Sequence, residues 1–311
     1  MKIVVLGSFV QACCWKVTRL PAAGETLTAS AFSIEAGGKG LNVAIGARRL
    51  GAEVDIMLGI GQDEAGDNLL HLLQHERIGT DYVWRLARQS GYGAGFIADD
   101  GQNAIAVYPG PNLLLTAEHA AQAAAALARA DLVYGQFETS VSAIHAAFAM
   151  ARRTGVRTVL NPSPWQNVPR SLLDHTDVLI VNEVEARALL GLAQPLPESL
   201  ADCVATLPQL LDSFWSWWSG SLLVVSLGSL GSLACERQRA VYQAPAFAVD
   251  AVDSVGAGDA FAAGFCVDLC RGVPLDHALR AGNACGALVA SRLGVLDALP
   301  HRAAVDEFLK A

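Results

Sequence analysis

Short apolar runs alternate along this chain with longer stretches in which apolar residues recur at helical spacing. Residues 2–7 form a continuous apolar run, as expected for a strand that is buried on both faces of a parallel sheet. From Thr116 to Leu190 strands and helices alternate regularly, which predicts right-handed βαβ units and an α/β fold with one mainly parallel sheet. The elements expected here are helices 117–129, 140–154 and 183–190 and strands 131–135, 156–160 and 177–181.

A looser pattern precedes this regular part. Residues 9–33 alternate irregularly and are interrupted by Pro21 and Gly24, which indicates short strands. Segments 91–99 and 103–108 meet at Asp99-Asp100-Gly101 and predict a hairpin. Together these segments suggest a small β element on one side of a larger α/β body, and the length of the chain allows one large domain or two average ones. The other expected elements are strands 54–60 and 222–227, short antiparallel strands within 231–249, and helices 65–77, 274–292 and 303–310.

Composition narrows the possible partners. The 311 residues carry a formal net charge of −8 without a cluster of Lys or Arg, which argues against nucleic acid or an anionic membrane as the main partner. No apolar run is long enough to span a bilayer, and the N-terminus resembles a strand more than a signal peptide, so we expect a cytoplasmic protein. The seven cysteines contain no CxxC pair and predict neither a disulfide framework nor a zinc site.

Residues 252–265 carry the strongest chemical signal. Gly256 and Gly258 precede Asp259, and an apolar run with helical spacing follows, so Asp259 is expected at a helix N-terminus. There the backbone of Gly256, Ala257 and Gly258 can present N–H groups to an anion while Asp259 accepts a proton, which is the arrangement that phosphoryl transfer needs. The alternative is a helix cap preceded by a glycine turn, without chemistry.

Three further motifs fall where strands end or helices begin. Glycines surround Lys39 in residues 36–42, and Asn182 and Glu185 leave a predicted strand three residues apart. The latter pair could organise the water shell of a phosphate-bound Mg²⁺ or could simply cap a helix. Gly228 and Gly231 permit a close backbone approach or a plain turn. A P-loop is excluded because GxxxxGK[ST] is absent, and the first strand is not followed by GxGxxG.

Together these motifs resemble the ribokinase-like (PfkB) carbohydrate kinases, and most closely the ribokinase branch. The resemblance rests on Gly37-Gly38-Lys39-Gly40-x-Asn42, Asn182-x-x-Glu185 and Asp253-Ser254-Val255-Gly256-Ala257-Gly258-Asp259, which follow in the family's order over essentially the whole chain. It implies a doubly wound α/β fold with a mainly parallel sheet flanked by helices, in a single domain that spans residues 1–311 and carries residues 9–35 and 91–110 as a small β lid. The activity that it implies is that of a cytoplasmic ATP-dependent sugar kinase with Mg²⁺ and a small sugar substrate. It also implies a homodimer formed through the lid.

The resemblance also assigns roles by position. Asp259 would be the base that deprotonates the sugar hydroxyl, and the amides from Gly256 to Asp259 would form the anion hole. Gly38, Lys39, Asn42 and Glu138 would bind the sugar. Asn182 and Glu185 would serve ATP and Mg²⁺, Glu185 through water, and Ser226, Gly228, Gly231, Gly258 and Asn283 would contact the nucleotide. Relatives of ribokinase are activated by a monovalent cation such as K⁺, whose ligands map mostly through backbone carbonyls to Asp253, Val255, Val289, Arg292 and Gly294.

The chain departs from the family pattern after its first strand. Val10-Gln11-Ala12 stands where these kinases usually carry Asn-x-Asp, whose Asp holds sugar hydroxyls. Gln11 could hydrogen-bond a substrate and Trp15 could stack on its ring. The acceptor is therefore ribose, a related pentose or deoxysugar, or, as an alternative, a nucleoside or pseudouridine. A non-catalytic sugar- or nucleotide-binding regulator is the rival from another class.

One aromatic run belongs to none of these motifs. Residues Phe214 to Trp218 include three tryptophans, and they predict either an interaction patch or a helix end that packs before the next strand.

Overall fold

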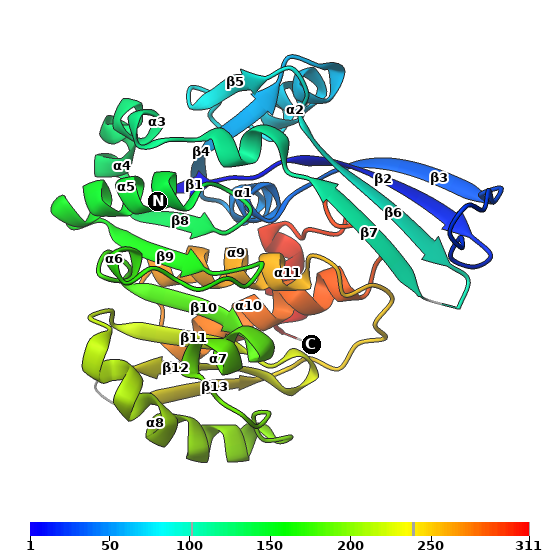
Figure 1. The fold of residues 1–311 in the computed structure, drawn as a ribbon. Helices are drawn as coiled ribbons and strands as arrows, with labels where there is room; N and C mark the ends of the chain where they lie inside the picture. Colours follow the sequence, from blue (N-terminus) through cyan, green and yellow to red (C-terminus); the bar gives the residue numbers. More distant parts are fainter. Residues whose placement is uncertain (101, 238–239, 311) are drawn as a thin grey trace.

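Two sheets organise the computed structural model, which describes residues 1–100, 102–237 and 240–310 (Figure 1). Within these residues the larger sheet has nine strands in the order β13-β12-β11-β10-β9-β8-β1-β4-β5. All neighbours pair in parallel except β11 with β12 and β12 with β13, so the predicted doubly wound α/β fold is confirmed. The strands are β1 (Lys2–Leu6), β4 (Glu53–Gly61), β5 (Val83–Ala87), β8 (Leu132–Gln136), β9 (Arg157–Asn161), β10 (Val178–Asn182), β11 (Leu222–Ser226), β12 (Gly231–Glu236) and β13 (Val241–Pro245).

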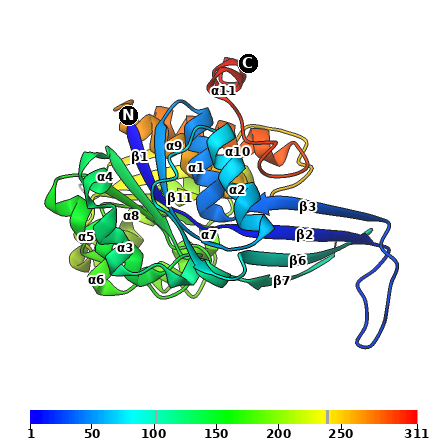
Figure 2. The same ribbon diagram turned by 90° about the horizontal axis from the view of Figure 1, so that it is seen from above.

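Helices cover both faces of this sheet (Figure 2). Strand β1 is apolar after Lys2 because both of its faces are buried: Ile3 and Val5 enter one core, whereas Val4 and Leu6 enter the other. The first core lies under α1 (Lys39–Arg49), α2 (Glu64–His75), α9 (Ala257–Cys270), α10 (Leu275–Ala290) and α11 (Arg302–Phe308). The second lies under α3 (Ala117–Gln122), α4 (Ala124–Arg129), α5 (Val141–Arg153), α6 (Arg170–Leu173), α7 (Glu183–Leu190) and α8 (Leu200–Trp217).

A second sheet projects from one end of the molecule (Figures 1 and 2). We call it the lid sheet; it consists of β2 (Val10–Val17), β3 (Ala31–Gly37), β6 (Gly91–Ala98) and β7 (Asn103–Tyr108) in the order β3-β2-β6-β7. Strands β6 and β7 form the predicted antiparallel hairpin, whose turn residue Gly101 lies outside the described residues. Strand β2 pairs with β6 in parallel.

The two faces of the lid sheet have different surroundings. Side chains alternate along each strand, so Gln11 and Trp15 share one face with Tyr92, whereas Ala12 shares the opposite face with Glu35. The Tyr92 hydroxyl donates a hydrogen bond of 3.2 Å to Asp63 at the start of α2. We call this face the outer face. On the inner face, Glu35 Oε2 lies 3.6 Å from the position that a Cβ atom on Gly294 would occupy, in the loop after α10.

Some elements differ from the sequence predictions. The helix predicted over 117–129 is two helices that meet at Ala123. The sequence patterns did not predict β5 or the full length of α8. Strand β5 is a half-buried edge strand without a strict alternation, and α8 contains Pro208, a residue that normally signals the end of a helix.

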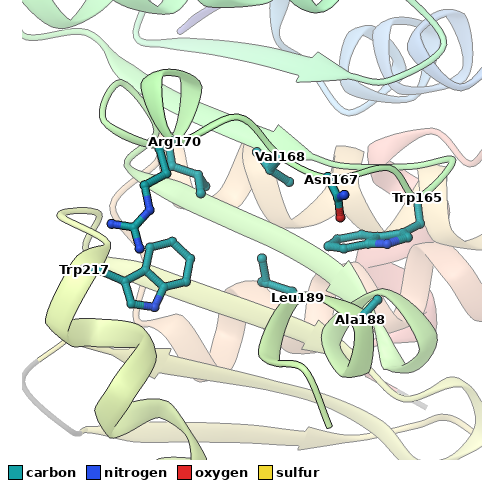
Figure 3. Close-up of a pocket in the computed structure, with 8 residues that line it drawn as sticks. Trp165, Asn167, Val168, Arg170, Ala188, Leu189 and Trp217 are labelled. Carbon is teal, nitrogen blue, oxygen red and sulfur yellow. The ribbon is translucent and has the colours of Figure 1, made fainter. Parts of the chain in front are cut away.

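The aromatic residues at 214–218 pack the C-terminal end of α8 against the second core. Phe214, Trp215 and Trp218 are buried, as the interpretation of a packed helix end predicted. Trp217 is only partly buried: its ring lies edge-on to Phe214 with ring centres 4.8 Å apart, and together with Arg170 it lines a pocket of about 270 Å³ (Figure 3). The guanidinium carbon of Arg170 is 4.9 Å from the centre of the Trp217 ring. Within the described residues no helix is long and apolar enough to cross a membrane.

Candidate active site

The start of α9 presents free backbone donors at the carboxyl edge of the large sheet. Gly256 caps the helix in the left-handed conformation at φ 79°, and a Cβ atom there would lie 2.3 Å from Val295, so only glycine fits. A Cβ atom on Gly258 would meet nothing within 4 Å. Among the described residues the N–H groups of Gly258 and Asp259 have no hydrogen-bond acceptor. The predicted helix start is therefore present, two residues before Asp259, with donors open to an anion.

Asp259 lies in the first turn of α9 and is only 6% exposed. Its Oδ2 accepts a hydrogen bond of 2.7 Å from Asn42 Nδ2. Burial raises the pKa of Asp259 to about 6, the nearby carboxylates of Glu138 and Glu185 act in the same direction, and the Lys39 charge and the Asn42 hydrogen bond oppose the rise. A carboxylate with a pKa near neutrality can both accept and release a proton under physiological conditions.

Glu138 joins three segments beside this carboxylate. Its Oε2 accepts hydrogen bonds from Ser8 Oγ at 2.7 Å and from the Lys39 backbone N–H at 2.8 Å. Ser8 Oγ in turn accepts from the Gly40 backbone N–H at 3.1 Å. A Cβ atom on Gly38, where φ is 122°, would stand 2.4 Å from the Ser8 carbonyl oxygen. The glycine loop at the start of α1 is thus held against the ends of β1 and β8, close to Asp259.

Two polar residues of this site were given no role by sequence reasoning. Ser8 supplies the hydroxyl that links Glu138 to Gly40, and Gln136 accepts the Glu138 N–H at 2.6 Å through Oε1. Gln136 is fully buried, and its Nε2 has no partner among the described residues. The signal that could have identified both is a polar residue placed at the carboxyl end of a buried strand.

The residues predicted for the nucleotide follow the ends of β10 and β11. Asn182 and Glu185 form a reciprocal capping box: Glu185 N–H donates to Asn182 Oδ1 and Asn182 N–H donates to Glu185 Oε2, both at 2.9 Å. The two side chains therefore cap the helix, as one of the two interpretations predicted. Glu185 Oε1 takes part in neither of the two capping hydrogen bonds. Ser226 is the register neighbour of Asn182 on β11, and the turn from Gly228 to Gly231 follows it.

Asn283 on α10 is held at the end of β13. Its Nδ2 donates to the carbonyl oxygens of Ala244 at 2.9 Å and Pro245 at 3.1 Å. Its side chain oxygen is not engaged in these bonds, so a nucleotide contact at this position remains a prediction.

The segments predicted to bind a monovalent cation lie side by side. The carbonyl oxygen of Ala290 accepts from the N–H groups of Val252 at 2.8 Å and Asp253 at 3.1 Å. Asp253 Oδ1 accepts from Val255 N–H at 3.0 Å, and the Val289 carbonyl accepts from Arg292 N–H at 3.1 Å. Gly294 follows in the same loop. Over the part of the chain that is described, no cluster of three or more His, Cys, Asp or Glu side chains could hold a metal ion.

Gln11 and Trp15 are not brought to Asp259. Both belong to the outer face of the lid sheet, where Trp15 stacks on Phe96 with ring centres 5.7 Å apart. Side chains alternate along β2, so Val10 and Ala12, the residues on either side of Gln11, lie on the inner face instead. This position does not favour the substrate contacts that the sequence suggested for Gln11 and Trp15.

The sequence and the fold of this chain are similar to those of known proteins. The family model described as pfkB family carbohydrate kinase matches residues 1–302. Ribokinase of Staphylococcus aureus is 32% identical over 303 residues and the match covers 96% of each chain; deoxyribokinase of Salmonella typhi is 32% identical over 264 residues, covering 84% of this chain and 83% of the relative. The structure of Arabidopsis thaliana ribokinase complexed with ribose and ATP superposes with a TM-score of 0.90 at 27% identity, over 100% of this chain and 99% of the other.

Proposed function

The chain belongs to the pfkB family of carbohydrate kinases and is an ATP-dependent carbohydrate kinase, and from this premise we propose that Asp259 is its general base and that its acceptor is ribose or a closely related pentose or deoxysugar. The observation that carries the proposal is the start of α9, where a buried carboxylate with a pKa of about 6 stands beside unpaired N–H groups. The similarity to ribokinases and a deoxyribokinase supports the pentose class.

In this mechanism Asp259 accepts the proton of the attacking sugar hydroxyl. The hydroxyl oxygen forms a bond to the γ-phosphorus as the bond from phosphorus to the bridging oxygen breaks, and ADP leaves. The N–H groups of Gly258 and Asp259 and the positive end of α9 stabilise the charge on the transferred phosphoryl group. Asn42 keeps the Asp259 carboxylate oriented through its 2.7 Å hydrogen bond.

We carry the other roles over from the family resemblance. Gly38, Lys39, Asn42 and Glu138 bind the sugar, and Asn182, Ser226, Gly228, Gly231 and Asn283 contact the nucleotide. Glu185 has a free carboxylate oxygen that suits the water shell of Mg²⁺, and this ion would neutralise phosphate charge when bound. The carbonyl-rich pairing of residues 252–255 with 289–294 suits a monovalent cation, with Asp253, Val255, Val289, Arg292 and Gly294 as its surroundings. The cytoplasmic location stays a prediction from sequence.

We also propose a homodimer that forms through the outer face of the lid sheet. Phe32 and Ile34 on this face are 53% and 52% exposed, and Trp15 packs against Phe32 with ring centres 5.0 Å apart. Monomeric proteins rarely leave an aromatic and aliphatic cluster of this kind open to water.

Phosphate transfer from ATP, measured across pentoses, deoxypentoses, hexoses and nucleosides with ATP hydrolysis as the control, tests the proposed acceptor. We expect the highest kcat/KM with a pentose or deoxypentose. A preference for nucleosides would replace the sugar by the alternative acceptor. Absence of turnover with every acceptor would favour the non-catalytic regulator.

A further inference from the structure

We infer that Glu35 is a specificity-determining residue that binds hydroxyl groups of the acceptor from the inner face of the lid sheet. The inference rests on the proposed function, since it concerns the acceptor side of the same site. Nothing in the resemblance assigns Glu35 a role. It is exposed on β3, and within the described residues neither a hydrogen bond nor an ion pair occupies its carboxylate.

The lid register determines which side chains accompany Glu35. Ala12 on β2 is its direct cross-strand partner, and Val10 and Cys14 lie on either side of Ala12 on the same face. The neighbouring positions of β6 on this face are Gly91, Gly93 and Gly95. Lys16, the other charged residue on the described part of this face, lies at the far end of β2, with Nζ 3.9 Å from Asp99 Oδ1. Glu35 is therefore the one acid that the described inner face can offer to a ligand.

A short series of contacts links Glu35 to the reacting end of the site. Its Oε2 lies 3.6 Å from where a Cβ atom on Gly294 would stand, and the next residue, Val295, packs against Gly256, which caps α9. Asp259 belongs to the first turn of that helix. The Glu35 carboxylate therefore lies on the face of the lid sheet that is directed toward the phosphoryl-transfer centre. The side chains around it on that face are small or apolar.

Carboxylate chemistry explains what Glu35 can recognise. An ionised carboxylate only accepts hydrogen bonds, and its two oxygens can receive two neighbouring hydroxyls of a sugar. An acceptor that lacks one of these hydroxyls leaves an oxygen without its partner, which is the basis of strong discrimination. Because Ala12 and Val10 have no polar side-chain atoms, this preference depends on β3 and not on β2.

Steady-state kinetics of Glu35→Gln and Glu35→Ala test the inference. We expect KM for the preferred pentose to rise about tenfold to a hundredfold, because a hydrogen bond to a charged group is lost, while kcat and KM for ATP change much less. Asp99→Asn, which removes another exposed lid carboxylate, is the matched control and should leave all three parameters unchanged.

A carboxylate moved to the opposite strand provides the second arm. Ala12 and Glu35 are direct partners, so Ala12→Asp in the Glu35→Ala background restores an acid at nearly the same place and should recover most of the lost sugar affinity. Ala12→Asp alone should lower KM for the sugar much less than it does in the Glu35→Ala background, because Glu35 already binds those hydroxyls; an equal gain in both backgrounds would show that the two acids act independently and would overturn the inference. If the double variant stays as weak as Glu35→Ala, or if KM for K⁺ shifts in place of KM for the sugar, Glu35 does not bind the acceptor.

Monodeoxy pentoses complete the test. For the sugar that lacks a hydroxyl bound by Glu35, the KM values of wild type and Glu35→Ala should converge, whereas for other sugars they should stay apart. An equal change for every sugar overturns the inference but leaves the kinase assignment intact. A wild-type enzyme that phosphorylates no pentose overturns the proposed acceptor, and this inference falls with it.

Discussion

The start of α9 and the lid sheet both border the site, yet they are built in opposite ways. Asp259 is 6% exposed and is fixed by close packing: a Cβ atom on Gly282 would lie 2.8 Å from Phe261, and one on Gly264 2.8 Å from Cys285. The lid sheet is a single layer in which Phe32 on one face and Ile105 on the other are 53% and 68% exposed. The proposed base therefore lies in a rigid core, whereas the lid residue proposed to bind the acceptor lies on an exposed surface, where we expect substitutions to cost little stability.

Asp259→Asn is expected to have the largest effect and tests the role of the start of α9 in catalysis. We expect kcat to fall about a thousandfold, because the base is lost while the backbone donors stay in place. ATP affinity, measured by calorimetry, should change little. Turnover close to that of the wild type would refute the role of Asp259 as the base.

Gly256 and Gly258 form a matched pair within the same turn. Gly256→Ala should lower the free energy of unfolding by about 2–4 kcal/mol, since alanine is strained at positive φ and its Cβ would clash with Val295. Gly258→Ala should leave stability nearly unchanged but lower kcat, because its Cβ would enter the space open to the phosphoryl group. Urea denaturation and kinetics measure both. Equal stability of the two variants would contradict the packing argument.

The raised pKa of Asp259 also predicts a stability effect. The pKa of this carboxyl is about 6 in the folded state and 3.8 is its ordinary value, so the folded state binds more protons between these values and stability falls as the pH rises through them. The loss amounts to at most about 3 kcal/mol. Asp259→Asn, which cannot ionise, should therefore be more stable than the wild type at pH 8, by thermal or urea unfolding. A less stable variant would show that burial does not raise this pKa.

The same titration predicts the pH dependence of activity. A base must be deprotonated, so kcat/KM for the sugar should fall about tenfold per pH unit below pH 6 and level off above it. KM for ATP, followed at each pH, separates this effect from titration of the nucleotide. A flat profile down to pH 5 would place the essential base elsewhere.

The smallest effect on turnover is expected on the outer face of the lid sheet. Phe32→Asp should dissociate the proposed dimer in light-scattering measurements, while kcat changes by no more than about twofold. Ser33→Asp puts the same charge on the adjacent residue, whose side chain points to the other face, and should leave the dimer intact. Dissociation by Ser33→Asp alone would reverse the assignment of the two faces.

The sequence predicted the rigid side better than the lid. Continuous apolar runs and glycine positions determine β1 and the start of α9, because burial on both faces and close approach demand those residue types. The parallel sheet and the place of Asp259 at a helix start were predicted from them, whereas the order of the strands was not. Pro208 within α8 and the division of one predicted helix at Ala123 could not be read from periodicity alone, since tertiary packing decides both.

The lid required information that a linear pattern does not contain. Which face a side chain occupies depends on the register between strands, so the linear pattern alone could not distinguish Gln11 from its neighbours as a substrate ligand. Glu35 became a candidate only when its pairing with Ala12 and its approach to Gly294 were visible. For Asn182 and Glu185 the helix cap was one of the two interpretations that the sequence allowed, and the structure shows the two side chains in a reciprocal capping box.

The parallel pairing of β2 with β6 has a consequence for the order of folding. Val10 pairs with Gly91, about 80 residues away, and the intervening chain supplies α1, β4, α2 and β5 to the body of the protein. Contacts between such distant segments form only after the intervening chain has been organised, so the lid sheet is expected to assemble last and to open first. In native-state hydrogen exchange the amides of β2 should then exchange through openings that leave β1 protected. In such openings the lid would no longer bind the acceptor, while the start of α9 with Asp259 would still be folded.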